Sequence, residues 1–208
     1  MHRLRSASIT TKLLVSITVL AAAATLAGLG TFATFTSSTS ASNTVSSGSV
    51  TIALGAVGPA NRLTVNATAV APGDTIQRAF DLSNSGTVDL AGAPTLTTSV
   101  ATTSLLDSDT TNGLQMVIDK CSVAWTESGG PAYTYTCSGT TTSVLASRPV
   151  IGTNLALSNV ADLVPAGAGP DHLRLTLSLP SGAGNTFQNL SSTLTYAFSA
   201  TQRAGTNK

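Results

Sequence analysis

Apolar and polar residues alternate through much of the chain after residue 49, and a period of two residues is the pattern of a β-strand with one buried face. The clearest alternations lie near the C-terminus, in residues 172–180 (HLRLTLSLP) and 192–202 (STLTYAFSATQ). Earlier in the chain, Val50, Ile52 and Leu54 alternate in the same way. Each of these segments is therefore predicted to be a strand.

Further short strands are predicted between turn signals. Residues 75–84 carry apolar side chains at every second position with Arg78 interrupting the series, and Pro72–Asp74 and Asn84–Gly86 are turn sequences on either side. Residues 138–147 are polar, and residues 148–164 predict short strands or one helical turn. Eight to ten strands with regular turns predict an all-β fold, an antiparallel two-sheet sandwich of jelly-roll-like or immunoglobulin-like type.

The N-terminal segment predicts export. Residues 13–30 are apolar or small and uncharged, and they follow a leader that contains Arg3, Arg5 and Lys12 but no acidic residue. A basic region followed by an apolar run is typical of a secretory signal, which would form a helix during export. Cleavage is predicted between Ala33 and Thr34.

Two alternatives to this cleavage stay open. A second small-x-small site ends at Ala41, and the apolar run approaches the roughly 20 residues that span a bilayer, so the leader could also be retained as an anchor. With cleavage after Ala33, the predicted organisation is a signal peptide (1–33), a flexible polar arm (34–49) and a β-sandwich domain (50–208).

Composition narrows the set of partners. The leader removes three cationic residues, which leaves seven Lys and Arg against nine Asp and Glu and a net charge of about −2. Nucleic acid is then excluded as an expected partner, because phosphate binding needs clustered cations. After leader cleavage no polybasic segment remains to hold the chain on anionic lipid. A surface rich in Ser and Thr and poor in charge favours edge-to-edge association of sheets.

The two cysteines predict a disulfide. Cys121 and Cys137 lie in a chain with an export signal, and neither is part of a CxxC motif. The segment CSVAWTESGGPAYTYTC is symmetric about Gly129, so we expect a hairpin that turns there and pairs Cys121 with Cys137. Val123, Trp125, Tyr133 and Tyr135 would share one face with the cysteines.

Candidate catalytic and metal-binding residues are few. His172 is the only histidine outside the leader, so neither a zinc site of the usual kind nor a Ser-His-Asp triad is expected. Residues 107–113 (DSDTTNG) space oxygen ligands as a calcium loop does, but Gly113 comes one position late for an EF-hand and Ile118 stands where the bidentate Glu belongs. We expect a polar turn there, with calcium binding left open, and no cofactor.

Three stretches of the chain, taken together, resemble the TasA and camelysin family of secreted bacterial proteins. The first resembles the family's junction between leader and first strand, the second its PGDT and NxGT turns, and the third its closing strands. In order they are residues 28–36 with 47–52 (GLGTFATFT, SGSVTI), 71–75 with 82–87 (APGDT, LSNSGT), and 179–180 with 184–189 and 194–202 (LP, GNTFQN, LTYAFSATQ).

The resemblance implies a jelly-roll domain exported to the cell surface. Family members assemble there into biofilm matrix fibres by donor-strand exchange, in which the N-terminal strand of one subunit completes the sheet of the next. The assembly strand would here be Val50, Ile52 and Leu54. The expected function is therefore a secreted, non-enzymatic matrix or surface-fibre subunit that associates with itself and with matrix or cell-wall material.

Two other functions are also compatible with the sequence. Camelysins are classed as metallopeptidases, which makes a surface peptidase the alternative from the enzyme class. A monomeric surface adhesin or binding module is the third.

Overall fold

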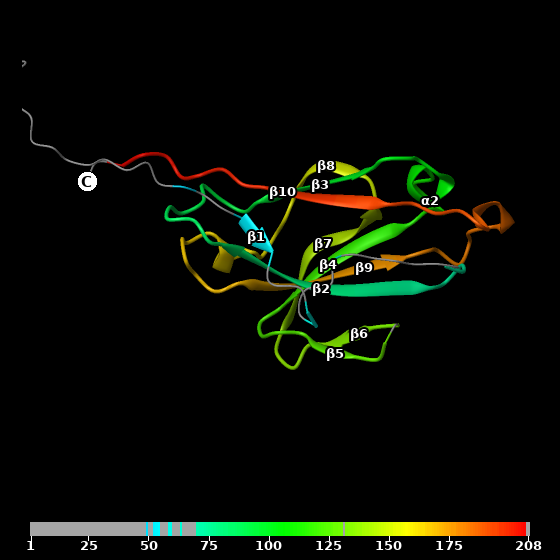
Figure 1. Cartoon of the computed structure of the whole chain (residues 1–208), viewed down its shortest axis with the longest axis horizontal. Coiled ribbons are helices and arrows are strands. Elements are labelled where there is room, and N and C mark those ends of the chain that lie inside the picture. Colours follow the sequence, from blue (N-terminus) through cyan, green and yellow to red (C-terminus); the bar gives the residue numbers. More distant parts are fainter. Residues whose placement is uncertain are drawn as a thin grey trace, which may run out of the picture. The chain divides into compact units, whose positions relative to one another are not determined.

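The computed structural model describes residue 49, residues 52–54, 58, 59 and 63, and residues 70–130 and 132–206 (Figure 1). The predicted leader with its cleavage sites lies outside these residues, as does nearly all of the predicted arm. The described part contains ten strands, one short α-helix and two 3-10 turns. They are β1 (Ile52–Leu54), β2 (Thr75–Asn84), β3 (Thr95–Val100), α2 (Leu105–Ser108), β4 (Gln115–Cys121), β5 (Thr126–Ser128), β6 (Thr134–Thr136), β7 (Thr141–Pro149), β8 (Gly152–Ala156), η1 (Ala161–Leu163), β9 (Asp171–Ser178), η2 (Asn185–Phe187) and β10 (Leu194–Ser199).

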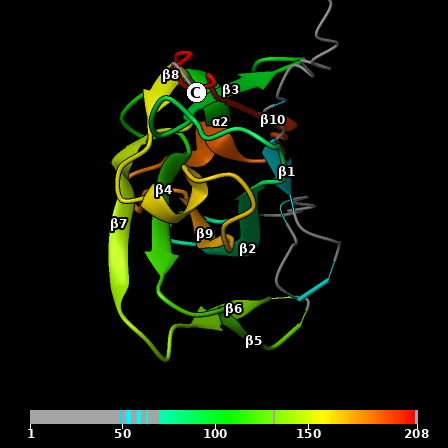
Figure 2. The ribbon, with the colours of Figure 1, turned by 90° about the vertical axis from the view of Figure 1, so that its left-hand side faces the viewer.

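The strands form two stacked antiparallel sheets and a separate hairpin. The larger sheet has the order β1-β2-β9-β4-β7, the smaller has the order β10-β3-β8, and β5 pairs with β6. From β2 to β4 and again from β7 to β10 the chain crosses between the two sheets, as in a jelly-roll-like sandwich. Figure 2 shows the two sheets and the β5–β6 hairpin beyond the larger one. The predicted all-β sandwich is confirmed.

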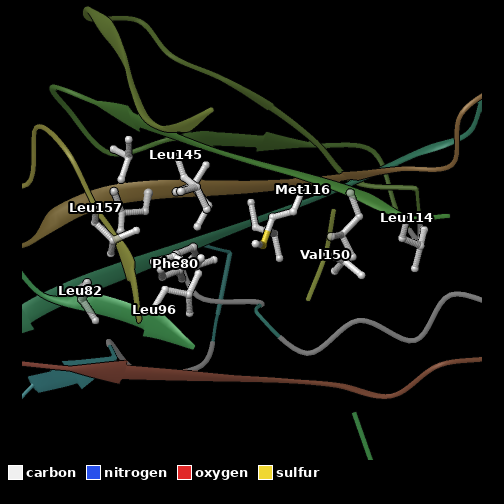
Figure 3. Close-up of a cluster of buried hydrophobic side chains, with 14 of the residues drawn as sticks. Phe80, Leu82, Leu96, Leu114, Met116, Leu145, Val150 and Leu157 are labelled. Atoms are coloured by element: carbon white, nitrogen blue, oxygen red, sulfur yellow. The ribbon is translucent and has the colours of Figure 1, made fainter. Parts of the chain in front are cut away.

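The core lies between the two sheets. The inner face of β9 presents Leu173, Leu175 and Leu177, as its alternation predicts, and these side chains are buried. Phe80 on β2 stacks at a tilt against Phe198 on β10, with ring centroids 5.6 Å apart, so the two sheets meet directly. Figure 3 shows the surrounding cluster, in which each fully buried Leu or Met contributes about 1.5–3 kcal/mol to stability.

The other face of the larger sheet carries a second, smaller cluster. Ala79 and Cys121 on this outer face are covered by Trp125 and Tyr135, which come from the β5–β6 hairpin and the turn before it. The hairpin therefore acts as a cover for the face that the smaller sheet leaves open.

The predicted register of this hairpin is wrong. Glu127 lies opposite Tyr135, so the pairing is centred on residue 131 and not on Gly129. Cys121 instead ends β4, where it pairs with His172 on one side and Thr141 on the other. The two long ladders of the larger sheet fix the position of Cys121, and only residues 126–136 remain to form the hairpin. Val123 does not join the buried face and is exposed.

Strand β7 lies in a segment that the sequence marked only as polar. Val144 and Leu145 are adjacent yet both buried, because the pairing of β4 with β7 shifts register near Ile118. A β-bulge of this kind breaks the two-residue period by which strands are predicted. The helical turn that the sequence allowed in residues 148–164 is present as η1.

Candidate functional site

The N-terminal edge of the larger sheet is the site that the sequence singles out for assembly. Strand β1 pairs antiparallel with the last three residues of β2, Ile52 opposite Asn84 and Leu54 opposite Leu82. Two further hydrogen bonds join Ser49 and Thr87: the Thr87 amide donates to the Ser49 carbonyl (2.8 Å), and the Ser49 amide donates to Thr87 Oγ1 (3.1 Å). Among the described residues, three paired positions and these two hydrogen bonds join this short segment to its own domain.

Leu54 is not buried, although the sequence predicts it on the buried face of its strand. Its side chain is 49% exposed, because β1 lies at the sheet edge and the core cluster does not include Leu54. The described part of the structure gives the backbone of Ile52 only, and Val50, Ala33 and Thr34 lie outside it. The assembly strand and the cleavage junction therefore stay predictions.

Strand β1 pairs with only one end of β2 among the described residues. Within the residues that the structure describes, β1 covers only Leu82–Asn84, and no strand pairs with Thr75–Asp81 on the side away from β9. Beyond the start of β2 there is a cleft of about 290 Å³. Its lining comes from the segment before β2, the end of β9 and the turn around η2: Val70, Ala71, Pro72, Leu179, Gly184, Asn185, Phe187, Gln188 and Asn189.

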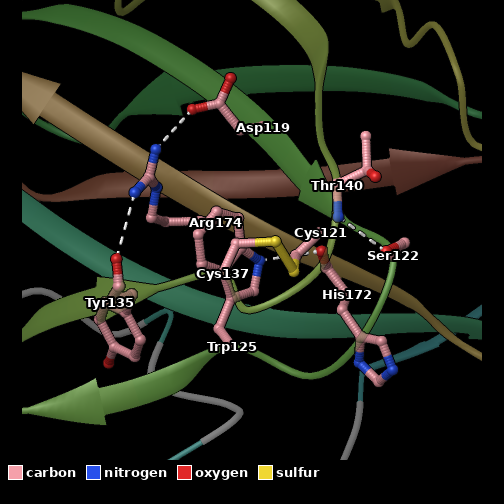
Figure 4. The surroundings of a disulfide bond; sticks show 9 residues. All are labelled: Asp119, Cys121, Ser122, Trp125, Tyr135, Cys137, Thr140, His172 and Arg174. Carbon is pink, nitrogen blue, oxygen red and sulfur yellow. Dashed lines mark hydrogen bonds and ion pairs between the residues drawn. A yellow bond between two sulfur atoms is a disulfide. The ribbon is translucent and has the colours of Figure 1, made fainter.

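The predicted disulfide between Cys121 and Cys137 is present and ties the hairpin to β4 (Figure 4). Trp125 lies beside it and donates its Nε1–H to the His172 carbonyl (3.0 Å). The neighbouring Tyr135 donates its hydroxyl to Glu127 (2.7 Å). Burial, and then this hydrogen bond to a carboxylate, raise the pKa of Tyr135 to about 12.

Arg174 joins the hairpin to the outer face by a second route. Its guanidinium lies over the Trp125 ring, donates to Asp119 Oδ2 (2.7 Å) and donates to the Tyr135 carbonyl (3.3 Å). The sequence alone does not predict this group. The sequence shows Arg174 and Asp119 only as charged residues at polar positions of two separate strands. It does not show that these two strands are neighbours in the sheet.

His172 does not lie at a sheet edge, because β9 is flanked by β2 and β4. Its Nδ1 is 2.7 Å from Asp81 Oδ1, and both side chains are about one-fifth exposed. The arrangement is an ordinary cross-strand pair on the outer face. It offers one imidazole and one carboxylate.

The segment from Asp107 to Gly113 forms a capped turn. Asp107 accepts hydrogen bonds from the Ser104 amide and from the hydroxyls of Thr103 and Ser192, while the Ser104 hydroxyl accepts from the Leu106 amide at the start of α2. Burial opposes ionisation of Asp107, but these hydrogen bonds together hold its pKa below the usual range. Both oxygens of this carboxylate therefore accept hydrogen bonds from groups of the protein itself.

The carboxylate of Asp109 also accepts hydrogen bonds from the protein. Its Oδ1 accepts from the backbone amides of Thr111 and Asn112, both at 2.9 Å, which lowers its pKa. The two carboxylates serve separate local hydrogen-bond systems. The geometry is that of the expected polar turn.

A group of charged side chains lies at one end of the core. Lys120 on β4 forms ion pairs with Asp171 at the start of β9 and with Asp162 on η1. In the sequence, Lys120 and Asp171 are each a charged residue at one end of an apolar alternation, Met116-Ile118-Lys120 and Asp171-Leu173-Leu175. Their contact depends on β4 and β9 being neighbours.

Two features, a set of metal ligands and a membrane-spanning helix, are not found among the described residues. Among residues 70–130 and 132–206 and the few described before them, no three His, Cys, Asp or Glu side chains gather as a set of metal ligands. In the same part of the chain, no helix has the length and apolar character needed to cross a lipid bilayer.

Comparison with known protein families places the chain in one of them. The model of a family described as camelysin metallo-endopeptidase matches residues 8–144, which is more than half of the chain. No protein of curated function matches the chain.

Proposed function

This chain belongs to the camelysin metallo-endopeptidase family, and we propose that it acts as an exported structural subunit that assembles through its N-terminal strand. The proposal includes the organisation inferred from the sequence: a leader of residues 1–33 cleaved between Ala33 and Thr34, an arm of residues 34–49, and a sandwich domain of residues 50–208. Fibres at the cell surface or in the extracellular matrix are the proposed product.

The observation that carries this proposal is the edge of β2. A three-residue strand, β1, occupies one end of the edge, and its Leu54 leaves half of its surface in water. Exchanging β1 for the same strand of another subunit would replace each contact with β2 by an identical one, so the exchange would cost little free energy. A longer donor segment could also pair with Thr75–Asp81, and these added backbone hydrogen bonds would favour the assembled state.

The cleft lies where such a longer strand would end. A strand that runs antiparallel to β2 from the β1 end passes Asp81 first and Thr75 last, and the segment just before Thr75 contributes Val70 and Pro72 to the cleft. The apolar side chains around the cleft offer a place for a donor residue. We therefore take β2 and the cleft as one acceptor surface.

The family description implies a catalytic metal, and the described residues do not fit one. Metallopeptidases hold their metal with three protein ligands, often two of them histidine. His172 and Asp81 supply two groups at most, and no third His, Cys, Asp or Glu of the described chain joins them. For this reason we derive no peptide-cleavage step and propose a structural role.

The test is a pair of substitutions in β1 with a matched control. Ile52→Asp and Leu54→Asp place a charge in the proposed interface, and desolvating it there costs about 1–3 kcal/mol or more, so polymer formation should weaken about 10- to 100-fold. Leu105→Asp is the control, because Leu105 is 44% exposed but lies in the first turn of α2. Static light scattering at equal concentration measures the polymer.

Each variant must keep the circular dichroism of the wild-type monomer. Equal polymer yields from all three variants would contradict assembly through β1. A wild-type protein that stays monomeric at high concentration would instead favour a monomeric adhesin or binding module.

A further inference from the structure

Lys120 and Asp171 extend the inner face of the larger sheet. In β4 the inward positions are Met116, Ile118 and then Lys120, and in β9 they are Asp171 followed by Leu173 and Leu175. Lys120 lies opposite Leu173, so Asp171 is its diagonal neighbour on the adjacent strand. The two charged groups are thus aimed into one end of the hydrophobic core.

The pair is enclosed to different degrees. The Asp171 side chain has no exposed surface, and the Lys120 side chain is 15% exposed. Lys120 Nζ contacts Asp171 Oδ1 directly, and it also lies 2.5 Å from Asp162 Oδ2. Asp162 is 63% exposed, so it connects the buried pair to water.

The three groups differ in how readily they ionise. Burial raises the pKa of Asp171, whereas the hydrogen bond from Lys120 lowers the pKa of Asp162. For Lys120, burial opposes the charged form, but the hydrogen bonds to the two carboxylates prevail and raise its pKa. Asp171 is therefore the carboxyl group that is easiest to protonate, and Asp162 is the one that stays ionised and accepts protons.

We propose that Lys120 and Asp171 condense to form an intramolecular isopeptide bond between β4 and β9, with Asp162 as the acid and base. This proposal is independent of how the subunits assemble. It assigns a covalent modification to a cluster in which a primary amine, a fully buried carboxyl group and a solvent-linked carboxylate meet.

The reaction balances without an added reagent. A proton passes from the Lys120 ammonium to the Asp171 carboxylate, and the resulting amine attacks Asp171 Cγ to form the new C–N bond. Asp162 takes a proton from the attacking nitrogen and delivers it to the departing hydroxyl group. The Cγ–O bond then breaks, one water molecule leaves past the exposed Asp162, and an amide remains.

Two physical effects favour this outcome inside the protein. Amine and carboxyl are held in contact by neighbouring strands, and effective concentrations in such arrangements reach about 10⁵–10⁸ M. A buried ion pair also loses the hydration of both charges, whereas an amide carries no net charge, so the interior shifts the balance away from the ion pair. In water the same condensation lacks both effects.

The test is the intact mass of the mature chain, with its N-terminus read by sequencing and its disulfide reduced. The wild-type protein is expected to be lighter than its sequence by one water molecule. Trypsin should fail to cut after Lys120, and residues 79–174 should remain one fragment with the same mass deficit. A wild-type protein of full sequence mass would overturn the proposal.

Three variants distinguish the isopeptide bond from other losses of water. Lys120→Arg keeps a cation beside both carboxylates but has no primary amine, so its mass should equal its sequence; a persistent deficit would point to a succinimide and overturn the proposal. Asp162→Asn should slow the appearance of the deficit about 100-fold. Asp89→Asn, at another exposed aspartate with a cationic partner (Arg203), should behave as wild type. An Asp162→Asn protein that forms the bond at the wild-type rate would remove Asp162 from the reaction.

Discussion

The guanidinium of Arg174 lies over the indole ring of Trp125, with Cζ 4.4 Å from the ring centroid. Arg174 belongs to the central strand β9, and Trp125 belongs to the turn that leads into the β5–β6 hairpin, so this contact fastens the hairpin to the sheet. The indole Nε1–H donates to the carbonyl of His172 two residues before Arg174. The stack and the hydrogen bond thus fix the ring at one place on the outer face.

We predict that Arg174→Lys will destabilise the protein by about 1–2 kcal/mol. Lysine keeps the charge but lacks the planar group that stacks on Trp125 while donating to Asp119 and to the Tyr135 carbonyl. Urea denaturation followed by fluorescence measures the change directly, because Trp125 is the only tryptophan. Arg203→Lys, at a more exposed ion pair, should change stability by less than about 0.5 kcal/mol. Equal effects of the two substitutions would contradict the role given to the stack.

We predict that the double substitution Cys121→Ser with Cys137→Ser will cost about 3 kcal/mol. The cysteines are 16 residues apart, and a cross-link over a loop of this length restricts the unfolded chain by about that amount. Thermal and urea denaturation of the variant and of the oxidised wild type give the difference. Reduction of the wild type should produce a similar loss. Unchanged stability in both experiments would contradict the stabilisation that we assign to the cross-link.

We predict that Asp107→Asn will destabilise the protein by about 1.5–3 kcal/mol at neutral pH, since hydrogen bonds to a charged group are the stronger kind. The pKa of Asp107 is lowered on folding, so its contribution is fully present above the usual carboxyl value of 3.8 and is lost as the pH falls through the folded pKa. Denaturation at several pH values should show the difference between wild type and variant shrinking below 3.8. A difference that is constant down to the acid limit would contradict the assignment.

We predict that Tyr135 will ionise only near pH 12. Burial disfavours the phenolate, and the Glu127 carboxylate, which accepts a hydrogen bond from the phenol hydroxyl, disfavours it further. Substituting Glu127→Gln should lower the pKa of Tyr135 towards its ordinary value of 10, as followed by ultraviolet titration of the tyrosines. A titration curve that is the same with and without Glu127 would remove this carboxylate as a cause.

Sequence reasoning was strongest where one strand alone sets the pattern. Leu173, Leu175 and Leu177 alternate because β9 has one face in the core, and such a strand can be recognised without knowing its neighbours. The sequence did not predict strand β7, because a bulge buries the adjacent Val144 and Leu145 together and so removes the two-residue alternation. The hairpin register failed because the ladders of β4 with β7 and β9, which are long-range, decide where Cys121 lies.

The same distinction applies to the functional features. The disulfide followed from the number of cysteines and the export signal, and the polar turn at Asp107–Gly113 followed from local spacing. The contacts of Arg174 with Trp125, and of Lys120 with Asp171, required the order of strands in the larger sheet. No pattern within one segment carries that order.

The most direct test of the proposed assembly compares two forms of the chain, residues 34–208 and a form that begins at Gly55. Light scattering and negative-stain electron microscopy at matched concentrations show whether each form makes polymers. We expect fibres from residues 34–208 and folded monomers from the shorter form, because only the longer one carries β1. Fibres from both forms, or folded monomers from both, would contradict assembly through the N-terminal strand.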